Sequence, residues 1–173
     1  MIDLIAIGTV DQDILDALKE SLAEVFAQRT HVGDSVALPG ESWNQQRGQH
    51  LAPLLLANVP SPPSPGHRVL AVIDVDICAP GLNFAFGQAE ISGKRALISL
   101  ARLRQEFYRL PRDESLFRER TLKEAVHELG HTYGLGHCPN PTCVMHFSNS
   151  LHDTDLRDWN FCPRCRAKVS REV

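Results

Sequence analysis

One stretch, HELGHTYGLGH at residues 127–137, decides how the rest of this chain can be interpreted. An α-helix turns once every 3.6 residues, so His127 and His131 lie on the same face, where both imidazoles can reach one metal ion. His137 cannot join them on an unbroken helix, because it would lie about 15 Å from His127 along the helix axis. The chain must therefore leave the helix and turn back. We expect Gly134 to end the helix, since glycine adopts the left-handed conformation at little cost.

The residue types of this stretch indicate a catalytic metal site. Three neutral histidines leave the fourth position of a tetrahedral zinc ion open for water, which is typical of catalytic and not of structural zinc. Glu128 is adjacent to a ligand, where its carboxylate can accept a proton from that water. We therefore predict His127, His131 and His137 as the ligands of a catalytic zinc ion and Glu128 as the catalytic base.

Four cysteines after the histidines indicate a second metal site. Cys138 and Cys143 have C-x4-C spacing, and Cys162 and Cys165 have C-x2-C spacing. Four thiolates make a closed structural zinc site, and the C-x2-C pair suggests a zinc-knuckle type of turn; two disulfides are the alternative. Residues 138–173 are too few to bury a core of their own, so a metal ion would replace the missing hydrophobic area. We therefore expect two zinc ions per chain. The second ion would anchor the turn that carries His137.

Together the two motifs resemble the archaemetzincins, a family in the metzincin clan of zinc peptidases. The family signature continues past the third histidine with a cysteine, then C-x4-C-x-M and a distant C-x-x-C, so the resemblance covers residues 127–165. Residues 74–76 and 81–87 are also similar to the family, but less specifically. The resemblance implies a single α+β catalytic domain, with an upper subdomain over residues 1–137, a lower one over residues 138–173 and a cleft between them.

The resemblance also assigns a role to Met145, which matches the methionine of a tight turn beneath the zinc ion. There the side chain supplies an apolar floor for the three imidazoles and is not a ligand. The alternative is a methionine that fills a gap in the core.

The hydrophobic periodicity predicts a mixed, twisted β-sheet backed by helices. Apolar runs predict buried strands at residues 2–7, 32–38, 68–77 and 95–100, and an edge strand at 82–89. Apolar residues at helical spacing predict helices at 11–26, 45–57 and 116–133. Thr121 and Glu124 have the spacing of a capping box, and four prolines make residues 60–66 a surface loop. The predicted order is βαβαβββα, an α/β fold in which the active-site helix comes last.

The composition fits a soluble globular protein of one domain. The chain has 173 residues, of which 23% are charged and 43% are hydrophobic. Its formal charge of −3 gives no electrostatic reason to expect nucleic acid or an anionic membrane as a partner. The chain lacks an apolar run of about 18 residues, and residues 1–8 lack the basic flank of a signal peptide. We expect a cytoplasmic monomer whose cysteines are reduced or bound to metal, with Cys78 in the core.

These observations predict a zinc metallopeptidase that hydrolyses peptide bonds. The resemblance implies that an extended peptide substrate lies antiparallel to the edge strand at residues 82–89. A peptide-binding protein that retains metal but turns over little is the first alternative, although a binder has no use for Glu128. A zinc-ribbon module for interaction or nucleic-acid binding is the second, and only the C-terminal residues favour it.

Overall fold

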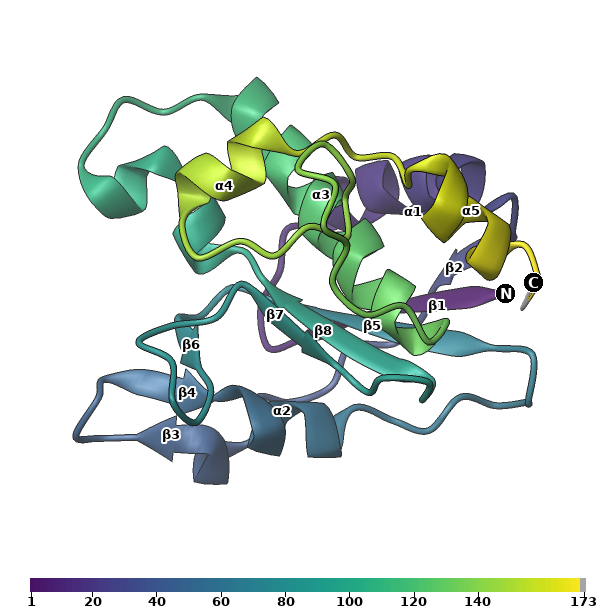
Figure 1. Cartoon of the computed structure of the whole chain (residues 1–173). Helices are drawn as coiled ribbons and strands as arrows, with labels where there is room; N and C mark the ends of the chain where they lie inside the picture. The colour runs from purple at the N-terminus through teal and green to yellow at the C-terminus, as the bar shows by residue number, and fades with distance from the viewer. Residues whose placement is uncertain (172–173) are drawn as a thin grey trace.

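The computed structural model describes residues 1–171 and is built around a five-stranded twisted sheet (Figure 1). In spatial order its strands are β2 (Thr30–Val32), β1 (Ile2–Ile7), β5 (Arg68–Ile73), β8 (Arg95–Ser99) and β7 (Gly87–Ala89). The first four strands are parallel, and β7 pairs antiparallel with β8 at the edge. The central strands β1 and β5 are almost entirely buried, as expected for a parallel sheet that is covered on both faces.

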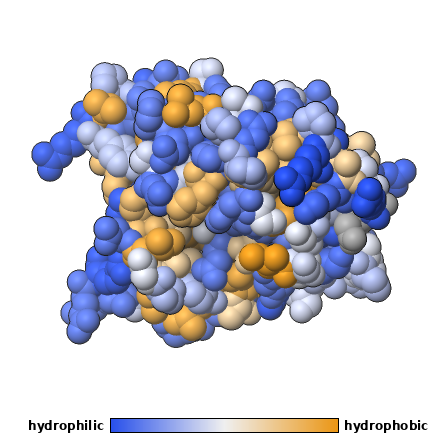
Figure 2. Space-filling model, in the orientation of Figure 1, coloured by the Kyte–Doolittle hydropathy of each residue, from blue (hydrophilic) through white to orange (hydrophobic). Residues whose placement is uncertain are grey.

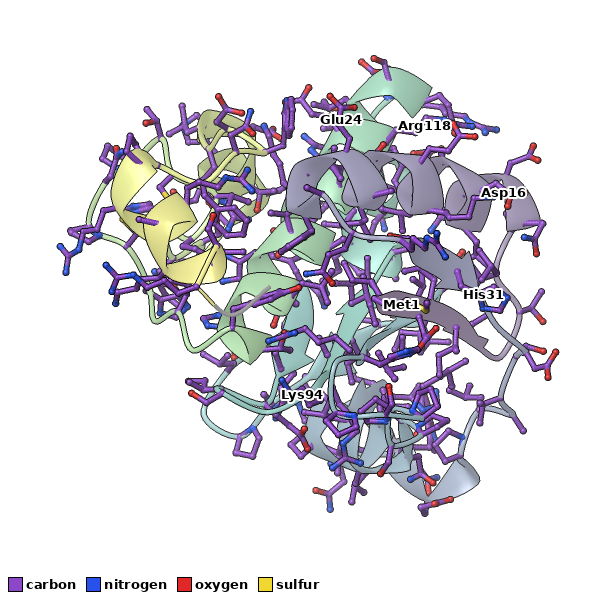
Figure 3. The ribbon with its side chains drawn as sticks, turned by 90° about the vertical axis from the view of Figure 1, so that its right-hand side faces the viewer. Met1, Asp16, Glu24, His31, Lys94 and Arg118 are labelled. Atoms are coloured by element: carbon purple, nitrogen blue, oxygen red, sulfur yellow. The ribbon has the colours of Figure 1, made fainter. Side chains whose placement is uncertain are left out.

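Helices cover both faces of this sheet. The helices α1 (Gln12–Phe26) and α3 (Glu114–Thr132) pack on one face, and α2 (Ala52–Asn58) packs on the other (Figure 1). The apolar side of α1 is buried, while its Asp16 and Glu24 point outward (Figure 3). Each face therefore has its own apolar cluster, and α3 is held against the sheet along most of its length.

A smaller sheet lies beside the first. It consists of β3 (Trp43–Asn44), β4 (Gln49–Leu51) and β6 (Ile77–Cys78), and the 3-10 turn η1 (Gly40–Ser42) precedes it. Two further 3-10 turns, η2 (Ala101–Leu103) and η3 (Gln105–Tyr108), connect β8 to α3. Cys78 is fully buried in β6, as predicted.

The C-terminal part contains two short helices, α4 (Leu151–Leu156) and α5 (Pro163–Val169), on the same side of the sheet as α1 and α3 (Figure 1). Its buried side chains belong to the same apolar cluster as those of α1 and α3, among them Val144, Met145, Phe161 and Val169. This part therefore packs onto the main core instead of forming one of its own. Among residues 1–171, none of the helices has the length and apolar content needed to cross a membrane.

The mixed, helix-backed sheet predicted from the sequence is confirmed. The strands at residues 2–7 and 95–100, the helix at 11–26 and the loop at 60–66 lie within one or two residues of their predicted bounds. The predicted edge strand is at the edge, but only Gly87–Ala89 forms a ladder. Of the residues before it, Ala85 makes one isolated bridge with Ile77.

The predicted helix at residues 45–57 is wrong in its first half. Residues 43–51 form the β3–β4 hairpin, whose turn uses Gly48 at φ +63° and is closed by a hydrogen bond from Gly48 N–H to Asn44 O (2.9 Å). Pro53 lies in the first turn of α2, where its missing N–H costs nothing, so it begins a helix instead of interrupting one.

Two strand predictions are misplaced. The strand predicted at 32–38 is β2, which ends at Val32, and only Val36 makes a further isolated bridge, with Ile7. The strand predicted at 68–77 ends at Ile73, and Ile77 belongs to the second sheet. In both cases the strand ends where polar residues or glycine interrupt the apolar run, at residues 33–35 and at Asp74.

The predicted capping box of Thr121 and Glu124 is also wrong. The N-cap of α3 is Asp113, whose Oδ1 accepts a hydrogen bond from Leu116 N–H (2.9 Å). Thr121 lies inside the helix and donates to Phe117 O (2.8 Å). A polar spacing of three residues recurs inside helices, so it marks a helix start only where no earlier cap is available.

Candidate active site

The three histidines converge on one point. His127 and His131 project from the same face of α3, with their Nε2 atoms 3.1 Å apart, and His137 brings a ring nitrogen within 4.8 Å of both. Two zinc ligands at about 2.0–2.1 Å in tetrahedral geometry would be about 3.3 Å apart. The helix ends at Thr132, and Gly134, at φ +76°, turns the chain back, with its N–H donating to His131 O (2.9 Å). The donor set and its spacing therefore fit a zinc ion.

Two of the histidines are oriented from behind by backbone carbonyls. Nδ1 of His127 lies 2.7 Å from Val144 O, and Nδ1 of His131 lies 2.7 Å from Leu135 O. An N–H at Nδ1 leaves Nε2 free to bind metal. Burial lowers the pKa of all three histidines below the usual value, and for His127 the nearby Arg157 lowers it further. The imidazoles are thereby kept neutral, which is the form that binds metal.

Glu128 is buried beside the histidines and packs against the edge strand. A Cβ atom on Gly87 would lie 2.6 Å from Glu128 Cγ and 2.7 Å from Leu97 O, so only glycine leaves room for the carboxylate at this place. Burial raises the pKa of Glu128 well above its usual value, Glu124 raises it further, and Arg157 opposes both. A divalent cation nearby would favour the ionised carboxylate.

Met145 is buried against the helix that carries two of the histidines. It is fully buried, and a Cβ atom on Gly130 would overlap its sulfur and lie 3.1 Å from Phe161 Cε1. Gly130 lies between the two helical histidines in the sequence, so the methionine packs directly against the helix backbone that carries them. The backbone O of Met145 also accepts a hydrogen bond from Cys138 N–H (2.9 Å), which ties this turn to the segment after His137.

The four predicted cysteines also come together. Their sulfurs lie within 4.8 Å of one another, and those of Cys138 and Cys162 are 3.8 Å apart. Zn–S bonds of about 2.3 Å in tetrahedral geometry place sulfurs about 3.8 Å apart, whereas a disulfide bond is about 2.05 Å long. All four are free thiols. This cluster therefore fits a closed zinc site, and not the two disulfides that the spacing left open.

The C-x2-C pair lies at the start of α5, where both of its sulfurs face the cluster. Cys162 is the N-cap of α5, and its N–H donates to Cys143 Sγ (3.3 Å). A backbone hydrogen bond from Cys165 lowers the pKa of Cys162 to about 7, whereas burial raises the pKa of Cys143 and of Cys165. A lowered pKa favours the thiolate, which is the form of cysteine that binds metal.

Sequence reasoning missed two buried charged residues of the site, Glu124 and Arg157. Both are almost fully buried and form an ion pair behind His127. One signal was available: Glu124 precedes His127 by three residues, so it lies on the same helix face as the ligands. A carboxylate on a buried face requires a cation, but nothing in the sequence indicated which one.

A cleft with a volume of about 430 Å³ runs across the site. One wall is formed by residues 81–89 and Ile91, the other by residues 147–149, and the histidines and Glu128 lie at its base. Leu82, Ile91 and Phe147 are exposed apolar side chains of these walls, and the Phe147 ring lies 4.7 Å from that of His137. Figure 2 shows hydrophobic side chains gathered near the middle of the face seen in Figure 1, between more hydrophilic margins.

The chain was compared with known proteins. A sequence profile of Peptidase family M54 matches residues 65–171. The archaemetzincin of Methanocaldococcus jannaschii is 47% identical over 163 residues, which cover 94% of this chain and 89% of that protein. The chain belongs to peptidase family M54. It is therefore a zinc metallopeptidase, as predicted, and the alternative of a peptide-binding protein with little turnover is not favoured.

Two solved structures agree with this M54 assignment. The archaemetzincin of Methanopyrus kandleri is 39% identical, with a TM-score of 0.86 over 99% of this chain and 93% of its own. The archaemetzincin of Archaeoglobus fulgidus, solved as a complex with malonate, is 38% identical, with a TM-score of 0.85 over 97% of this chain and 99% of its own. The predicted fold class and the predicted resemblance are both confirmed.

Proposed function

We propose that this M54 peptidase is of the metzincin type and binds two zinc ions. One is a catalytic ion held by His127, His131 and His137, and the other is a structural ion held by the four cysteines. The convergence of three neutral imidazoles at the base of an open cleft, with a buried glutamate beside them, carries this proposal. When bound, zinc supplies a Lewis acid that lowers the pKa of a coordinated water and polarises the peptide carbonyl.

Glu128 is the proton carrier in this proposal. Its carboxylate accepts a proton from the attacking water and then passes it to the leaving nitrogen of the peptide. Gly87 leaves the space that the carboxylate occupies, because any side chain there would displace it. The carbonyls of Val144 and Leu135 orient His127 and His131 by accepting hydrogen bonds from Nδ1 of each ring.

The substrate is an extended peptide that pairs with β7. This strand is the last in the sheet order, so its outer edge can add a strand. Gly87 contacts Glu128 near the middle of the site, and Ser92 N–H donates to His131 O (3.0 Å), so β7 runs in the same direction as α3. An antiparallel substrate then has its N-terminal side near Ile91 and its C-terminal side near Leu82. The exposed apolar side chains of the cleft walls favour apolar residues beside the cleaved bond.

The decisive test is the Glu128→Gln variant, assayed on a diverse peptide library with cut sites identified by mass spectrometry. We expect zinc content and fold to be unchanged and hydrolysis to fall by about 10²–10⁴-fold, the usual contribution of a general base. Glu20→Gln on the exposed face of α1 makes the same change of charge far from the cleft and is the control. Turnover by Glu128→Gln equal to that of the control would refute the assigned role.

The predicted setting of the enzyme belongs to the same proposal. Thiols that serve as metal ligands persist in a reducing compartment, which supports a cytoplasmic location. The formal charge of −3 supports a protein that acts on peptides and does not bind nucleic acid. That it acts as a monomer stays a prediction, which analytical ultracentrifugation of the zinc-loaded protein would test.

A further inference from the structure

Arg157 is a buried cation placed directly behind the first histidine of the triad. It follows α4 as its C-terminal cap, and only 2% of its surface is exposed. Arginine is always charged and carries only donors, so each hydrogen bond of its guanidinium must go to an acceptor. Its surroundings therefore show which acceptors the fold has collected around it.

The contacts of Arg157 join two segments of the site. Its Nη1 donates to Val144 O (2.8 Å) and to His146 O (3.0 Å), the carbonyls on either side of Met145. Its Nη2 donates to Glu124 Oε1 on α3. One rigid guanidinium thus fixes the turn around Met145 relative to the helix that carries two of the histidines.

The relation of Arg157 to His127 is indirect. Nη1 lies 2.7 Å from His127 Nδ1, and that nitrogen also lies 2.7 Å from Val144 O. When a neutral imidazole binds metal through Nε2, Nδ1 carries the hydrogen and needs an acceptor. Arginine cannot supply one, so the acceptor is Val144 O, which Arg157 itself holds in place.

Glu124 balances the charge of Arg157 and makes its burial possible. It accepts from Arg157 and, at 3.0 Å, from Thr154 Oγ1. A buried ion pair contributes little net stability compared with apolar side chains of the same volume. Stability therefore does not explain why the ion pair of Glu124 and Arg157 is buried here. The specific placement of Arg157 beside His127 and its carbonyl partner explains it better.

The helix α4 delivers Arg157 to this place. Arg120 of α3 binds Asp155 through two hydrogen bonds of 2.6 Å, and Lys123 Nζ donates to Asp155 O (3.1 Å). These contacts dock α4 on α3 two residues before Arg157. Arg120 is itself buried and also donates to Leu103 O, so it acts on the position of α4 and not directly on a histidine.

We propose that Arg157 is a positioning residue for the catalytic zinc site. It holds the Val144 carbonyl that orients His127, and it thereby makes zinc affinity depend on the docking of α4. The proposal deepens the proposed function and rests on zinc binding by the three histidines. It assigns no step of the reaction to Arg157.

The test measures zinc affinity at the histidine site by competition with a chelator, together with the visible absorption of the cobalt-substituted protein. Arg157→Lys keeps the charge but loses the fork that reaches both carbonyls and Glu124 at once. The paired variant Glu124→Met with Arg157→Met removes both charges and keeps the volume. Its net charge is unchanged, and we expect it to fold with about wild-type stability. Arg118→Lys makes the same substitution at an exposed position of α3, where the partner is Glu114 and not α4, and is the control.

We expect both Arg157 variants to bind zinc at the histidine site about 10–100-fold more weakly, the usual cost of losing a contact that orients a ligand. We also expect their cobalt spectra to shift, while Arg118→Lys matches the wild type in both measurements. If Arg157→Lys fails to fold, the paired variant decides. Wild-type zinc affinity in the folded Arg157 variants would overturn the proposal. A wild-type protein that binds zinc at the triad but hydrolyses no peptide would refute the proposed reaction and leave this inference standing.

Discussion

The two metal-ligand clusters follow one another in the sequence, yet they are built in different ways. His127 and His131 are fixed by one helix of 19 residues that packs along the sheet. The cysteines are carried by turns and by the first residues of the seven-residue helix α5. In the first cluster the scaffold places the ligands, whereas in the second the ligands, once they bind an ion, hold the scaffold.

The parts of the chain that carry the two clusters, residues 1–137 (the upper region) and residues 138–171 (the lower region), obtain their stability in different ways. The upper region buries two layers of apolar side chains against the sheet. The lower region adds buried side chains to only one of those layers. Because His137 and Cys138 are adjacent, the weaker region delivers the third ligand of the stronger one. We therefore expect the dependence between the clusters to be one-sided.

The strongest test of this dependence removes ligands of the lower cluster. In a Cys162→Ser, Cys165→Ser variant we expect loss of one zinc ion, loss of fixed structure after residue 137 and a fall in hydrolysis of about 10–100-fold. The reason is that Cys138 no longer anchors the turn that carries His137, and misplaced ligands cost up to about 100-fold. Cys78→Ala, in the core of the upper region, is the control and should retain both ions. Peptide cleavage at the control rate would show that the clusters are independent.

The reverse experiment removes the upper ion alone. A mild chelator should take zinc from the histidine cluster, which opens on the cleft, before it takes zinc from the four cysteines. We expect hydrolysis to be lost entirely, while the circular dichroism spectrum and most of the free energy of unfolding persist, because the sheet and helices place these histidines without metal. A large drop in the unfolding temperature when the first ion leaves would contradict this.

The sequence predicts the upper cluster well because its information is local. Helical spacing fixes His127, Glu128 and His131 relative to one another, and a glycine marks where the chain turns back toward His137. The same holds for β1, where an apolar run that ends at Gly8 predicts a buried strand to the residue. Local patterns of this kind depend only on backbone geometry, which every chain shares.

What the sequence does not predict depends on contacts between distant segments. Arg157 lies 30 residues from His127 and reaches it only because α4 docks on α3, and α4 is too short to show a helical period. The β3–β4 hairpin was missed for a similar reason. Its strands have two and three residues, and β4 also pairs with β6, which begins 26 residues after β4 ends.

A smaller change tests the junction between the two regions. Gly130→Ala would place a methyl group on the sulfur of Met145, and we expect it to cost about 1–3 kcal/mol of stability, as overpacking usually does. At an open helix position the same substitution would instead stabilise the protein by about 1 kcal/mol. Gly136→Ala is the control, because no atom lies within 4 Å of the position of its added carbon. Denaturant unfolding of the zinc-loaded proteins measures both, and equal stabilities would mean that Met145 yields without cost.

The smallest effect separates the regions by their helix caps. Asp113 caps α3 through Leu116 N–H (2.9 Å), and Ser150 caps α4 through Asp153 N–H (3.3 Å). Alanine at either position should cost about 1 kcal/mol, the usual value of a cap. In α3 the packing of a long helix holds the later turns in place without the cap, so amide exchange should change only in the first turn. In α4, which has six residues, the same loss should raise exchange throughout the helix and, because α4 carries Arg157, lower zinc affinity at the histidine site. If amide exchange in α4 and zinc affinity both stay at the wild-type values, the ion pairs to α3, and not the cap, hold this helix in place.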